Sequence, residues 1–351
     1  MNPLKKIKIS GYKSLKEMDL EFHNMNILIG SNGAGKSNLL AFFEMLLAIK
    51  NYSFQNFVTE QGGANILLYN GRKVTSSIKF ALYNTDNMFH AIIQAKAGDR
   101  LYFASQGLFD CEKQTNFYVA NGFDERKDDG ILKQFSVLQD IGVYHFHDTS
   151  VSSPIKASCD INDNIELASD GRNLAAILYR LKATELDVYE RIVETIRLTA
   201  PYFQDFVLRE NPLNPHSMRL EWKKVGCDIP FGADQLSDGT LRFICLTVLL
   251  CLPPALGKNI ILIDEPELGL HPFSLTIISE LMRKYAMTHQ VIVATQSVEF
   301  LNEFRLEDII TVETQGGASV FKRLDVEHLK DWLDDYTIGE LWQKNVLGGR
   351  P

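Results

Sequence analysis

The sequence predicts an α/β fold with a parallel sheet covered by helices. The apolar run over residues 26–29 is typical of a buried strand, and it enters a glycine-rich turn at Gly30. Apolar residues then recur at helical spacing from Leu39 to Leu47. The last third of the chain alternates strand-like and helical runs, over residues 259–263, 272–285, 290–294 and 309–312. Such alternation indicates a parallel sheet with helical connections.

Two other regions are predicted between the glycine-rich turn with its helix and the last third of the chain. Short β-rich runs over residues 74–83 and 88–96, with glycine-containing turns beside them, predict an antiparallel β-subdomain. A buried run over residues 141–146 leads into a helical pattern over residues 173–199, which predicts a helical insertion. This helical pattern is too short for a coiled-coil arm.

The composition is that of a globular protein without a membrane span. The chain has 351 residues, of which 45% are hydrophobic and 23% are charged. It has no apolar stretch of about 18 residues and no secretion signal, so a cytoplasmic location is expected. The formal net charge of −8 gives no general sign of nucleic-acid binding, so any DNA contact would need a local patch. The densest basic cluster fits a solvated strand edge as well as a phosphate contact, and comprises Lys5, Lys6, Lys8, Lys13 and Lys16.

The strongest motif lies in the glycine-rich turn. Residues 30–37 read GSNGAGKS and fit G-x-x-x-x-G-K-S, the Walker A pattern, in which glycines turn backbone N–H groups toward phosphate oxygens. We expect Lys36 to reach the β and γ phosphates of ATP and Ser37 to ligate Mg²⁺. The strand before the motif and the helix after it are the setting that this function requires. The other nucleotide-binding residues expected from this loop are Asn32, Gly33, Ala34, Gly35 and Asn38.

A buried run over residues 260–263 ends in two acids, the form of a Walker B element. We expect Asp264 to hold Mg²⁺, directly or through water. Glu265 follows, and it is expected to polarise the attacking water as the general base. The alternative is an acidic helix N-cap, since Pro266 comes next.

A third element, LSDGT at residues 236–240, precedes a strongly apolar helical run. By itself, Ser237 at a helix start is typical of an N-cap. The order of Walker A, LSDGT, the stretch ILIDEPELGLHP and a strand ending in Thr295-Gln296-Ser297 nevertheless resembles the ABC ATPases, particularly their RecF, SMC and OLD-like branch.

Four further stretches are similar to compact bacterial RecF-like AAA-family ATPases without coiled-coil arms. They are HFHDTS at residues 145–150, DGRNLAA at 170–176, IGELW at 338–342 and LGGRP at 347–351. Together with the ATPase motifs they extend the resemblance over most of the chain. The expected fold is therefore a P-loop NTPase of the ABC-ATPase head type, with an antiparallel β-subdomain and a helical insertion.

The resemblance implies a homodimer with two composite ATP sites. In ABC dimers the signature serine and glycine of one subunit complete the γ-phosphate site of the other through a helix N-terminus, which implies this role for Ser237 and Gly239. Residues 268–272 match the D-loop, in which His271 is expected to be structural. Gln296 or Ser297 would replace the switch histidine of transporters, and we place Gln296 among the catalytic residues with Glu265 and Lys36.

Two more elements follow from the same resemblance. Residues 11–15 resemble a stretch that places Lys13 and Ser14 against the nucleotide, although a solvated lysine after an edge strand is an alternative. For the Q-loop we favour His147 and Asp148 over Gln61, and His147 is our third metal-ligand candidate beside Ser37 and Asp264. His145 would share a strand face with His147, but two histidines without a third ligand are typical of ordinary polar residues.

These motifs divide the chain into three expected domains. ATPase lobe I covers residues 1–150, the helical insertion 151–230, and ATPase lobe II with a C-terminal tail 231–351. The resemblance implies a Mg²⁺-dependent ATP hydrolase acting on DNA in genome maintenance or phage defence. The alternative is a nucleotide-gated scaffold or sensor that controls a toxin or nuclease effector. The signature and D-loop disfavour a small-molecule kinase, and the missing switch histidine disfavours a transporter subunit.

Overall fold

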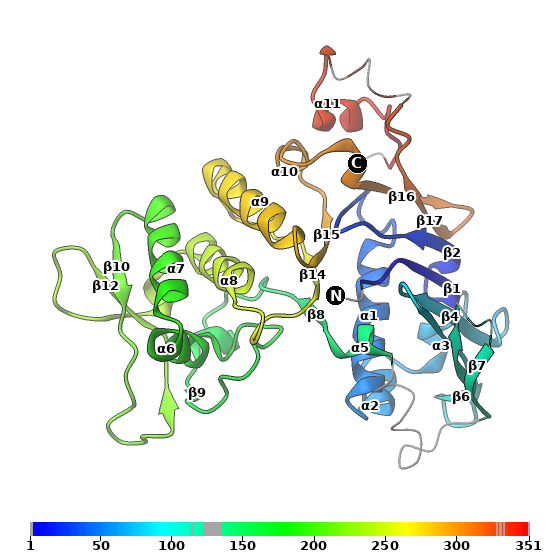
Figure 1. Cartoon of the computed structure of the whole chain (residues 1–351), viewed down its shortest axis with the longest axis horizontal. Coiled ribbons are helices and arrows are strands. Elements are labelled where there is room, and N and C mark those ends of the chain that lie inside the picture. The colour runs from blue at the N-terminus through cyan, green and yellow to red at the C-terminus, as the bar shows by residue number, and fades with distance from the viewer. Residues whose placement is uncertain are drawn as a thin grey trace. The chain divides into compact units, whose positions relative to one another are not determined.

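The computed structural model describes residues 3–111, 113, 115–121, 135–327, 329, 332 and 334–349. The helices are α1 (Lys36–Lys50), α2 (Phe54–Glu60), α3 (Ala64–Leu67), α5 (Ser136–Gln139), α6 (Leu174–Thr184), α7 (Leu186–Thr199), α8 (Asp238–Cys251), α9 (Pro272–Ala286), α10 (Val298–Leu301) and α11 (Ile338–Gln343) (Figure 1). The strands are β1 (Lys6–Tyr12), β2 (Leu15–Glu21), β3 (Met25–Ile29), β4 (Ser77–Tyr83), β5 (Asn87–Lys96), β6 (Arg100–Asp110), β7 (Thr115–Asn121), β8 (Ile141–Tyr144), β9 (Cys159–Asp160), β10 (Phe203–Phe206), β11 (Ser217–Met218), β12 (Glu221–Lys224), β13 (Phe231–Gly232), β14 (Ile260–Asp264), β15 (Gln290–Thr295), β16 (Ile309–Gln315) and β17 (Ala318–Arg323).

The chain forms two compact units. Unit 1 comprises Met1–Val143, Asn259–Leu262 and His289–Pro351, and unit 2 comprises Tyr144–Lys258 and Ile263–Thr288. These bounds differ from the three consecutive segments expected from the sequence. The reason is that the parallel sheet of unit 1 takes its strands from both ends of the chain.

That sheet has the order β17-β16-β3-β15-β14-β8. Strand β3 pairs in parallel with β15 and β16, and β17 is antiparallel at the edge. Backbone hydrogen bonds join the starts of neighbouring strands: Val291 N to Asn24 O (2.7 Å), Gln290 N to Asn259 O (2.8 Å) and Ile260 N to Asp140 O (2.9 Å). The strands β3, β15, β14 and β8 therefore run in the same direction, and their carboxyl ends share one edge of the sheet.

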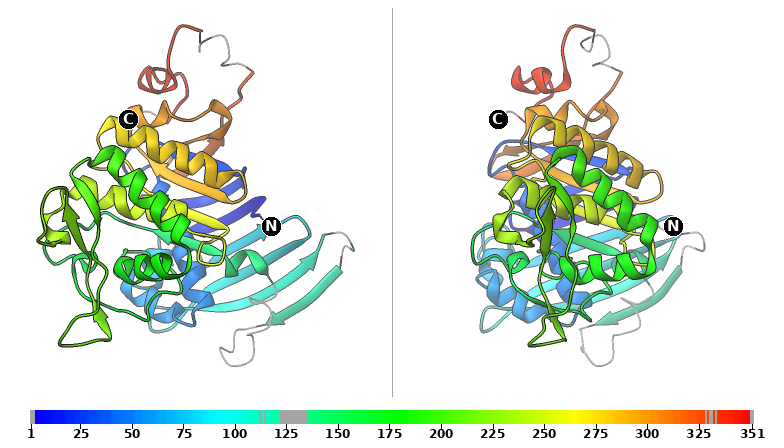
Figure 2. Two further views of the ribbon diagram at one scale, coloured as in Figure 1. Left: turned by 60° about the vertical axis from the view of Figure 1, so that its left-hand side comes forward. Right: turned by 90° about the vertical axis from the view of Figure 1, so that its left-hand side faces the viewer.

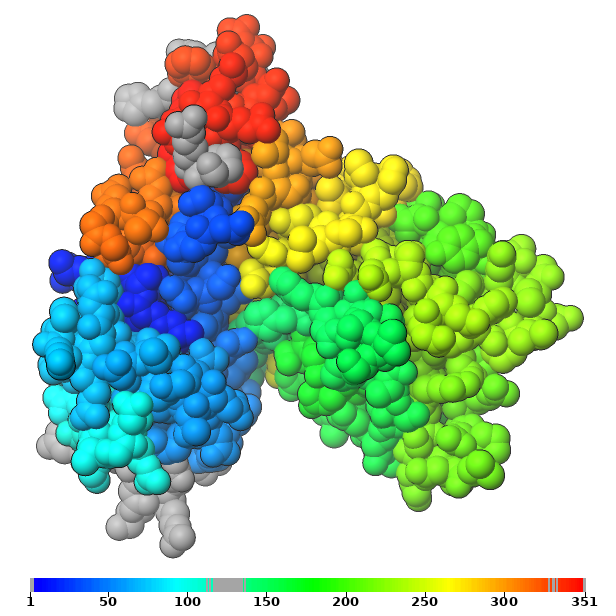
Figure 3. Space-filling model, turned by 180° about the vertical axis from the view of Figure 1, so that it is seen from behind, coloured from blue at the N-terminus to red at the C-terminus, as the bar shows by residue number. Residues whose placement is uncertain are grey.

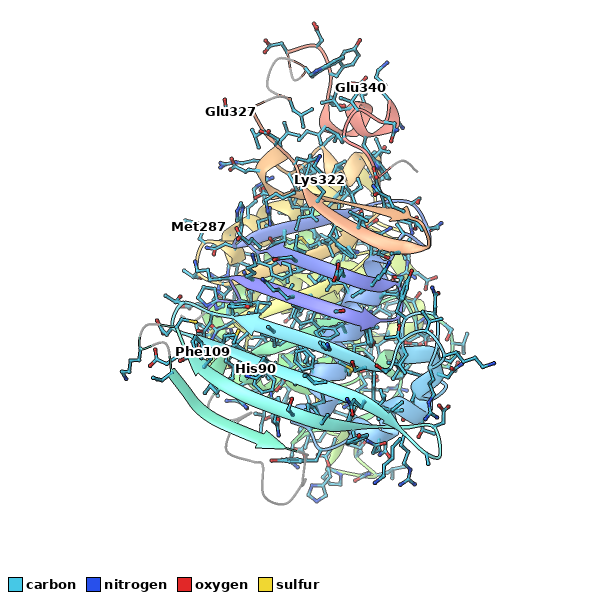
Figure 4. The ribbon with its side chains drawn as sticks, turned by 90° about the vertical axis from the view of Figure 1, so that its right-hand side faces the viewer. His90, Phe109, Met287, Lys322, Glu327 and Glu340 are labelled. Atoms are coloured by element: carbon cyan, nitrogen blue, oxygen red, sulfur yellow. The ribbon has the colours of Figure 1, made fainter. Side chains whose placement is uncertain are left out.

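The second sheet of unit 1 is antiparallel, with the order β2-β1-β4-β5-β6-β7. Figure 4 looks onto it and labels His90 on β5 and Phe109 on β6. The predicted β-subdomain is thus present, but β4 begins at Ser77 and Val74 lies in the turn before it. Along β1 and β4, buried side chains alternate with more exposed ones, as expected for a sheet that packs against the core with one face only.

Helix α1 contributes the centre of the core of unit 1. Its buried face joins apolar residues from both sheets in one cluster. Phe42 is fully buried, and its ring meets the rings of Tyr12 and Phe80 edge-on at centroid distances of 5.4 and 5.2 Å. The glycine-rich turn at the start of α1 is therefore held by a helix that is itself fixed from two sides.

Unit 2 is built from helices α6 to α9 and two small antiparallel sheets, β10-β12-β13 and β9-β11. Figure 2 shows α6, α7 and α8 as neighbours within it. The helical pattern expected over residues 173–199 is two helices, because Glu185 between them has the non-helical angles φ −141° and ψ 58°. The expected helical insertion also contains strands β9 to β12, which sequence periodicity did not show.

Among the helices of the described residues, none combines the length and the apolar character needed to cross a bilayer. The longest helices described in units 1 and 2 are α1 and α9, with 15 residues each. Neither approaches the length of a coiled-coil arm.

Replacing Phe42 by alanine should destabilise unit 1 strongly, because a cavity would open between α1 and the antiparallel sheet. We expect a loss of about 3–5 kcal/mol in the free energy of unfolding, seen as a lower urea midpoint. Val74→Ala is the matched control, since Val74 is 67% exposed, and it should change stability by less than about 0.5 kcal/mol. Equal midpoints for the two variants would contradict this account of the core.

Candidate functional site

The Walker A loop connects β3 to α1 in unit 1. Gly33 and Gly35 have φ of 78° and 114°, a region that favours glycine, and Gly35 is the N-cap of α1. The first N–H groups of a helix have no partner within the helix and carry partial positive charge. The loop therefore has the backbone form that holds an anion at a helix start.

Lys36 places a buried cation at this loop. Lys36 is only 5% exposed, and its Nζ donates to the carbonyl oxygens of Gly30 (2.5 Å) and Ser31 (3.2 Å). Ser37, the next residue, is exposed at the start of α1. A buried ammonium beside a helix N-terminus suits the phosphates of a nucleotide, so these residues fit the group that the sequence implies.

The loop also rests on the hairpin of β16 and β17. A Cβ atom at Gly30 would lie 2.2 Å from the carbonyl oxygen of Val312, and one at Gly35 would lie 2.0 Å from Oγ of Ser319. Both glycines are thus required by the close approach of the hairpin, through its backbone at Gly30 and through the Ser319 side chain at Gly35. This contact with the hairpin was not predicted, because it joins residues almost 300 positions apart.

Lys13 and Ser14 lie beside the same loop. Ser14 Oγ is 2.6 Å from Ser319 Oγ and accepts a hydrogen bond of 2.6 Å from the side-chain amide of Asn38. Lys13 has a φ of 44°, donates to Gln61 Oε1 at 2.8 Å, and has a pKa lowered by burial. Lys13 is therefore half-buried and bonded, in contrast to the alternative of a solvated lysine.

A cavity of about 730 Å³ opens next to these residues in unit 1. Its lining includes Lys13, Asn38, Asn65, Ile66, Leu68 and Asn70. Apolar side chains and amides together suit a flat polar ring such as a nucleobase. Lys13 and Asn38 were expected beside the nucleotide, whereas Asn65, Ile66, Leu68 and Asn70 were not predicted from the sequence.

The segment after α11 supports the strand that precedes the loop. Gly349 N donates to Glu313 Oε1 at 2.5 Å, which lowers the pKa of Glu313, and Trp342 Nε1 donates to Gly349 O at 2.7 Å. A Cβ at Gly349 would lie 3.2 Å from the carbonyl oxygen of Ile29, the residue before Gly30. Figure 3 shows the red residues of this segment gathered beside the blue and orange parts of unit 1. The last two residues of the LGGRP stretch lie outside the described residues.

Gln296 and Ser297 follow β15 in unit 1. Ser297 Oγ accepts from Phe300 N at 3.1 Å as the N-cap of α10, and its own N–H donates to Thr295 Oγ1 at 3.0 Å. Ser297 is thus engaged in local structure, whereas Gln296 is half-buried at the strand end. Ser297 therefore has a structural role as a helix cap.

The acidic pair lies at the end of β14. Asp264 is the last residue of the strand, and Glu265 after it has a φ of 40°. A left-handed conformation at a residue other than glycine, asparagine or aspartate is strained and is found most often at functional positions. The strained backbone at Glu265 is therefore consistent with a functional role for this residue.

The HFHDTS loop lies beside this strand end in unit 2. The run over residues 141–146 is buried apart from the half-buried His145, but β8 ends at Tyr144, so the strand face that His145 and His147 were expected to share is wrong. His147 Nε2 is 2.9 Å from the carbonyl oxygen of Asp264, while Asp148 is exposed and its Oδ1 accepts from Ser150 N at 3.0 Å. Of the two Q-loop candidates, only His147 is bonded to the end of β14.

Arg242 on α8 holds two loops of unit 2 together. It donates to the carbonyl oxygens of Phe146 (3.2 Å), His147 (2.8 Å) and Leu268 (2.9 Å), and also approaches Thr149 Oγ1 at 3.3 Å. The guanidinium thus links the HFHDTS loop to the D-loop. The sequence analysis missed this residue, because an arginine in a predicted helix gives no signal by itself.

The signature lies against the D-loop within unit 2. Ser237 is the N-cap of α8 and accepts from Thr240 N at 3.2 Å, as its local sequence predicts. A Cβ at Gly239 would lie 2.2 Å from the carbonyl oxygen of Gly269, so the two backbones touch. Ser237 and the D-loop residue Leu268 are both exposed. His271 caps α9 through Nδ1, which is the structural role expected of it.

Comparison with protein families identifies the chain. Residues 25–302 match the family described as "AAA domain, putative AbiEii toxin, Type IV TA system". The chain belongs to this family. The match includes the Walker A loop, the signature, the acidic pair and the strand that ends before Gln296. No curated protein sequence matches the chain.

Solved structures of Smc heads share the fold of this family member. The Pyrococcus furiosus Smc head with an extended coiled coil, bound to the C-terminal domain of ScpA, has a TM-score of 0.61 at 15% identity, covering 95% of this chain and 99% of that one. The SmcHead bound to the C-winged helix domain of ScpA has a TM-score of 0.59 at 16% identity, covering 93% and 99%. The Pyrococcus yayanosii head with a coiled coil and joint has a TM-score of 0.58 at 11% identity, covering 95% and 99%.

The chain is therefore an AAA-domain protein of this family, and its fold is similar to that of SMC-type ATPase heads. The predicted fold class is confirmed, with an antiparallel sheet and a parallel sheet in the positions of a P-loop ATPase. Membership of the family indicates ATP binding and points to ATP hydrolysis.

We expect Arg242→Lys to lower the turnover number of ATP hydrolysis by about tenfold, because an ammonium cannot bond several carbonyls at once. Arg242 is a positioning residue, so the affinity for a fluorescent ATP analogue should stay within about twofold of wild type. Arg172→Lys is the control, since Arg172 is exposed and its guanidinium contacts Asp170, two residues earlier in the chain. Wild-type turnover in the Arg242 variant would show that it does not position these loops.

Proposed function

We propose that the chain binds ATP with Mg²⁺ and hydrolyses it at composite sites of a homodimer. The observation that carries this proposal is the pair of exposed elements in unit 2, the signature at the start of α8 and the D-loop in contact with it. A helix N-terminus that faces outward with its own N-cap serine can receive an anion held by another subunit. The motifs of unit 1 would supply that anion, as the phosphates of ATP.

Each candidate residue has a role that follows from its position. Lys36 and the first turn of α1 hold the phosphates, while Ser37 and Asp264 offer the oxygen ligands that Mg²⁺ prefers. When bound, the ion neutralises charge that develops on the phosphates. Glu265 accepts a proton from the attacking water, and Gln296 orients that water. Lys13, Ser14 and Asn38 lie beside the loop where the rest of the nucleotide would extend.

The dimer would be stabilised by nucleotide. Exposed apolar side chains lie in the D-loop and at the start of α9, namely Leu268 (37% exposed) and Phe273 (54% exposed). Because ATP would contact both subunits only in the closed state, its binding shifts the population toward the dimer, and hydrolysis releases it. Ser237 and Gly239 act in this scheme on the nucleotide of the partner.

Glu265→Gln should trap the closed dimer. The amide keeps the shape of the carboxylate but cannot accept a proton, so turnover should fall by at least about 100-fold while ATP binding persists. Light scattering with and without ATP and Mg²⁺ measures the dimer, and phosphate release measures turnover. A variant that stays monomeric with ATP, or that hydrolyses ATP normally, would refute the role of Glu265.

Composite sites can be tested by mixing two inactive variants. Lys36→Ala removes the phosphate contact of a subunit, and Ser237→Arg blocks its signature surface. Their heterodimer contains one intact site, so a random mixture should regain about a quarter of wild-type activity, whereas neither variant alone is active. No recovery, with mixed dimers shown by two different affinity tags, would argue against action in trans.

We further propose that the ATPase acts on DNA in genome maintenance or phage defence. Support comes from the likeness to Smc heads and not from a visible basic surface. Within the basic cluster near the N-terminus, Lys6 and Lys8 form ion pairs with Asp19, and Lys6 also contacts Glu21. A DNA contact at this strand would have to displace these carboxylates.

The second candidate function is control of an effector protein. It is favoured by the family description, which names a toxin and a toxin–antitoxin system, and by the Smc heads whose structures contain a bound domain of ScpA. In this scheme the ATP-bound dimer would hold a toxin or nuclease and release it after hydrolysis.

The two functions predict different responses to DNA. Stimulation of ATP hydrolysis by double-stranded or single-stranded DNA, decreasing steeply with salt, is expected for the first. An unstimulated ATPase that binds a protein encoded beside it only in the ATP-bound state is expected for the second. The Glu265→Gln variant suits both assays, because it prolongs the ATP-bound state.

A further inference from the structure

We propose that His145, His147 and Asp264 form a binding site for a divalent transition-metal ion. Each residue offers one ligand atom, and these atoms all lie within 4.8 Å of one another in unit 2. Ligands of one ion at about 2.1 Å are separated by about 3–4 Å, so small side-chain rotations would complete the site. Two imidazoles and one carboxylate are a ligand set that first-row transition metals accept.

The sheet explains why the three residues meet. Strands β8 and β14 are neighbours, and the bond between their first residues aligns their carboxyl ends. Asp264 ends β14, and the two histidines follow the end of β8 with one residue between them. The imidazole rings are 6.1 Å apart between centroids and tilted by 55°, so they are not stacked on each other.

The backbone around these ligands is already fixed. Arg242 donates to the carbonyl oxygens of Phe146 and His147, which holds the peptide that carries both histidines. His147 Nε2 also lies 2.9 Å from the carbonyl oxygen of Asp264. Ligands that are oriented by outer hydrogen bonds lose less entropy when an ion binds, and such bonds commonly raise metal affinity by about 10–100-fold.

The ligand types separate this site from the proposed Mg²⁺ position. Mg²⁺ prefers an octahedron of oxygens, whereas imidazole nitrogen favours ions such as Co²⁺, Cu²⁺ and Zn²⁺. Asp264 is a proposed ligand of both Mg²⁺ and the transition-metal ion, so this proposal rests in part on the proposed ATP site. It adds His145 as a ligand and predicts that the site prefers softer ions than Mg²⁺. It does not require nucleotide, because all three ligands come from one unit of one chain.

The first test is Co²⁺ binding to the full chain without nucleotide and without a histidine tag, in excess Mg²⁺. Visible absorption of the bound ion should show one Co²⁺ per chain. His145→Gln and His147→Gln should each weaken binding by at least about tenfold. His216→Gln is the matched control, since His216 is an exposed histidine of the same unit, and it should bind as wild type does. Absence of stoichiometric Co²⁺, or unchanged binding in folded His145→Gln, would overturn the proposal.

A second measurement needs no variant. Cu²⁺ added at one equivalent to the wild-type chain should show nitrogen hyperfine coupling from imidazole in pulsed electron paramagnetic resonance, and a spectrum with oxygen ligands alone would contradict the site. These outcomes are separate from the proposed function. Metal binding without ATP hydrolysis would refute the ATPase proposal alone, and hydrolysis with Mg²⁺ in a chain that binds no Co²⁺ would refute this inference alone.

Discussion

The common direction of β3, β15, β14 and β8 is the constraint on which the candidate groups depend. Parallel strands of one sheet present their carboxyl ends at the same edge, and the loops that follow them must begin there. The Walker A loop, Gln296, the acidic pair and the HFHDTS loop each follow one of these strands. Within unit 1 this direction brings the Walker A loop and Gln296 to one edge of the sheet, and within unit 2 it brings the acidic pair to the HFHDTS loop.

A second constraint is the lack of space around the Walker A loop. The backbone at Gly30 meets that at Val312, and Gly35 lies against the side chain of Ser319. A loop packed this closely keeps its shape before any ligand arrives, so less binding free energy is spent on ordering it. Arg242 has a comparable effect in unit 2, where one guanidinium fixes two loops.

The sequence predicted the parts of the site that are continuous in the chain. Residues 30–37 and the pair Asp264 and Glu265 form motifs in which neighbouring residues act together, so their order alone is informative. Ser319, Arg242 and Glu313 were missed because their contacts join distant segments. The strand expected to include His145 was also wrong, because an apolar run does not show where pairing stops. Likewise, helical periodicity did not show the break at Glu185, where only the backbone angles change.

The contact between Gly349 and Ile29 links the Walker A strand to a residue some 320 positions later in the chain. During synthesis, the strand and its loop leave the ribosome long before Glu313, Ser319 and Gly349 exist. The nascent chain therefore carries an unfinished phosphate loop while the residues between Ile29 and Glu313 are made, and its helix α1 exposes apolar surface until strands β14 to β16 have formed. Competence to bind nucleotide should appear abruptly, which would delay any ATP-driven association until the segment that holds Gly349 has been made.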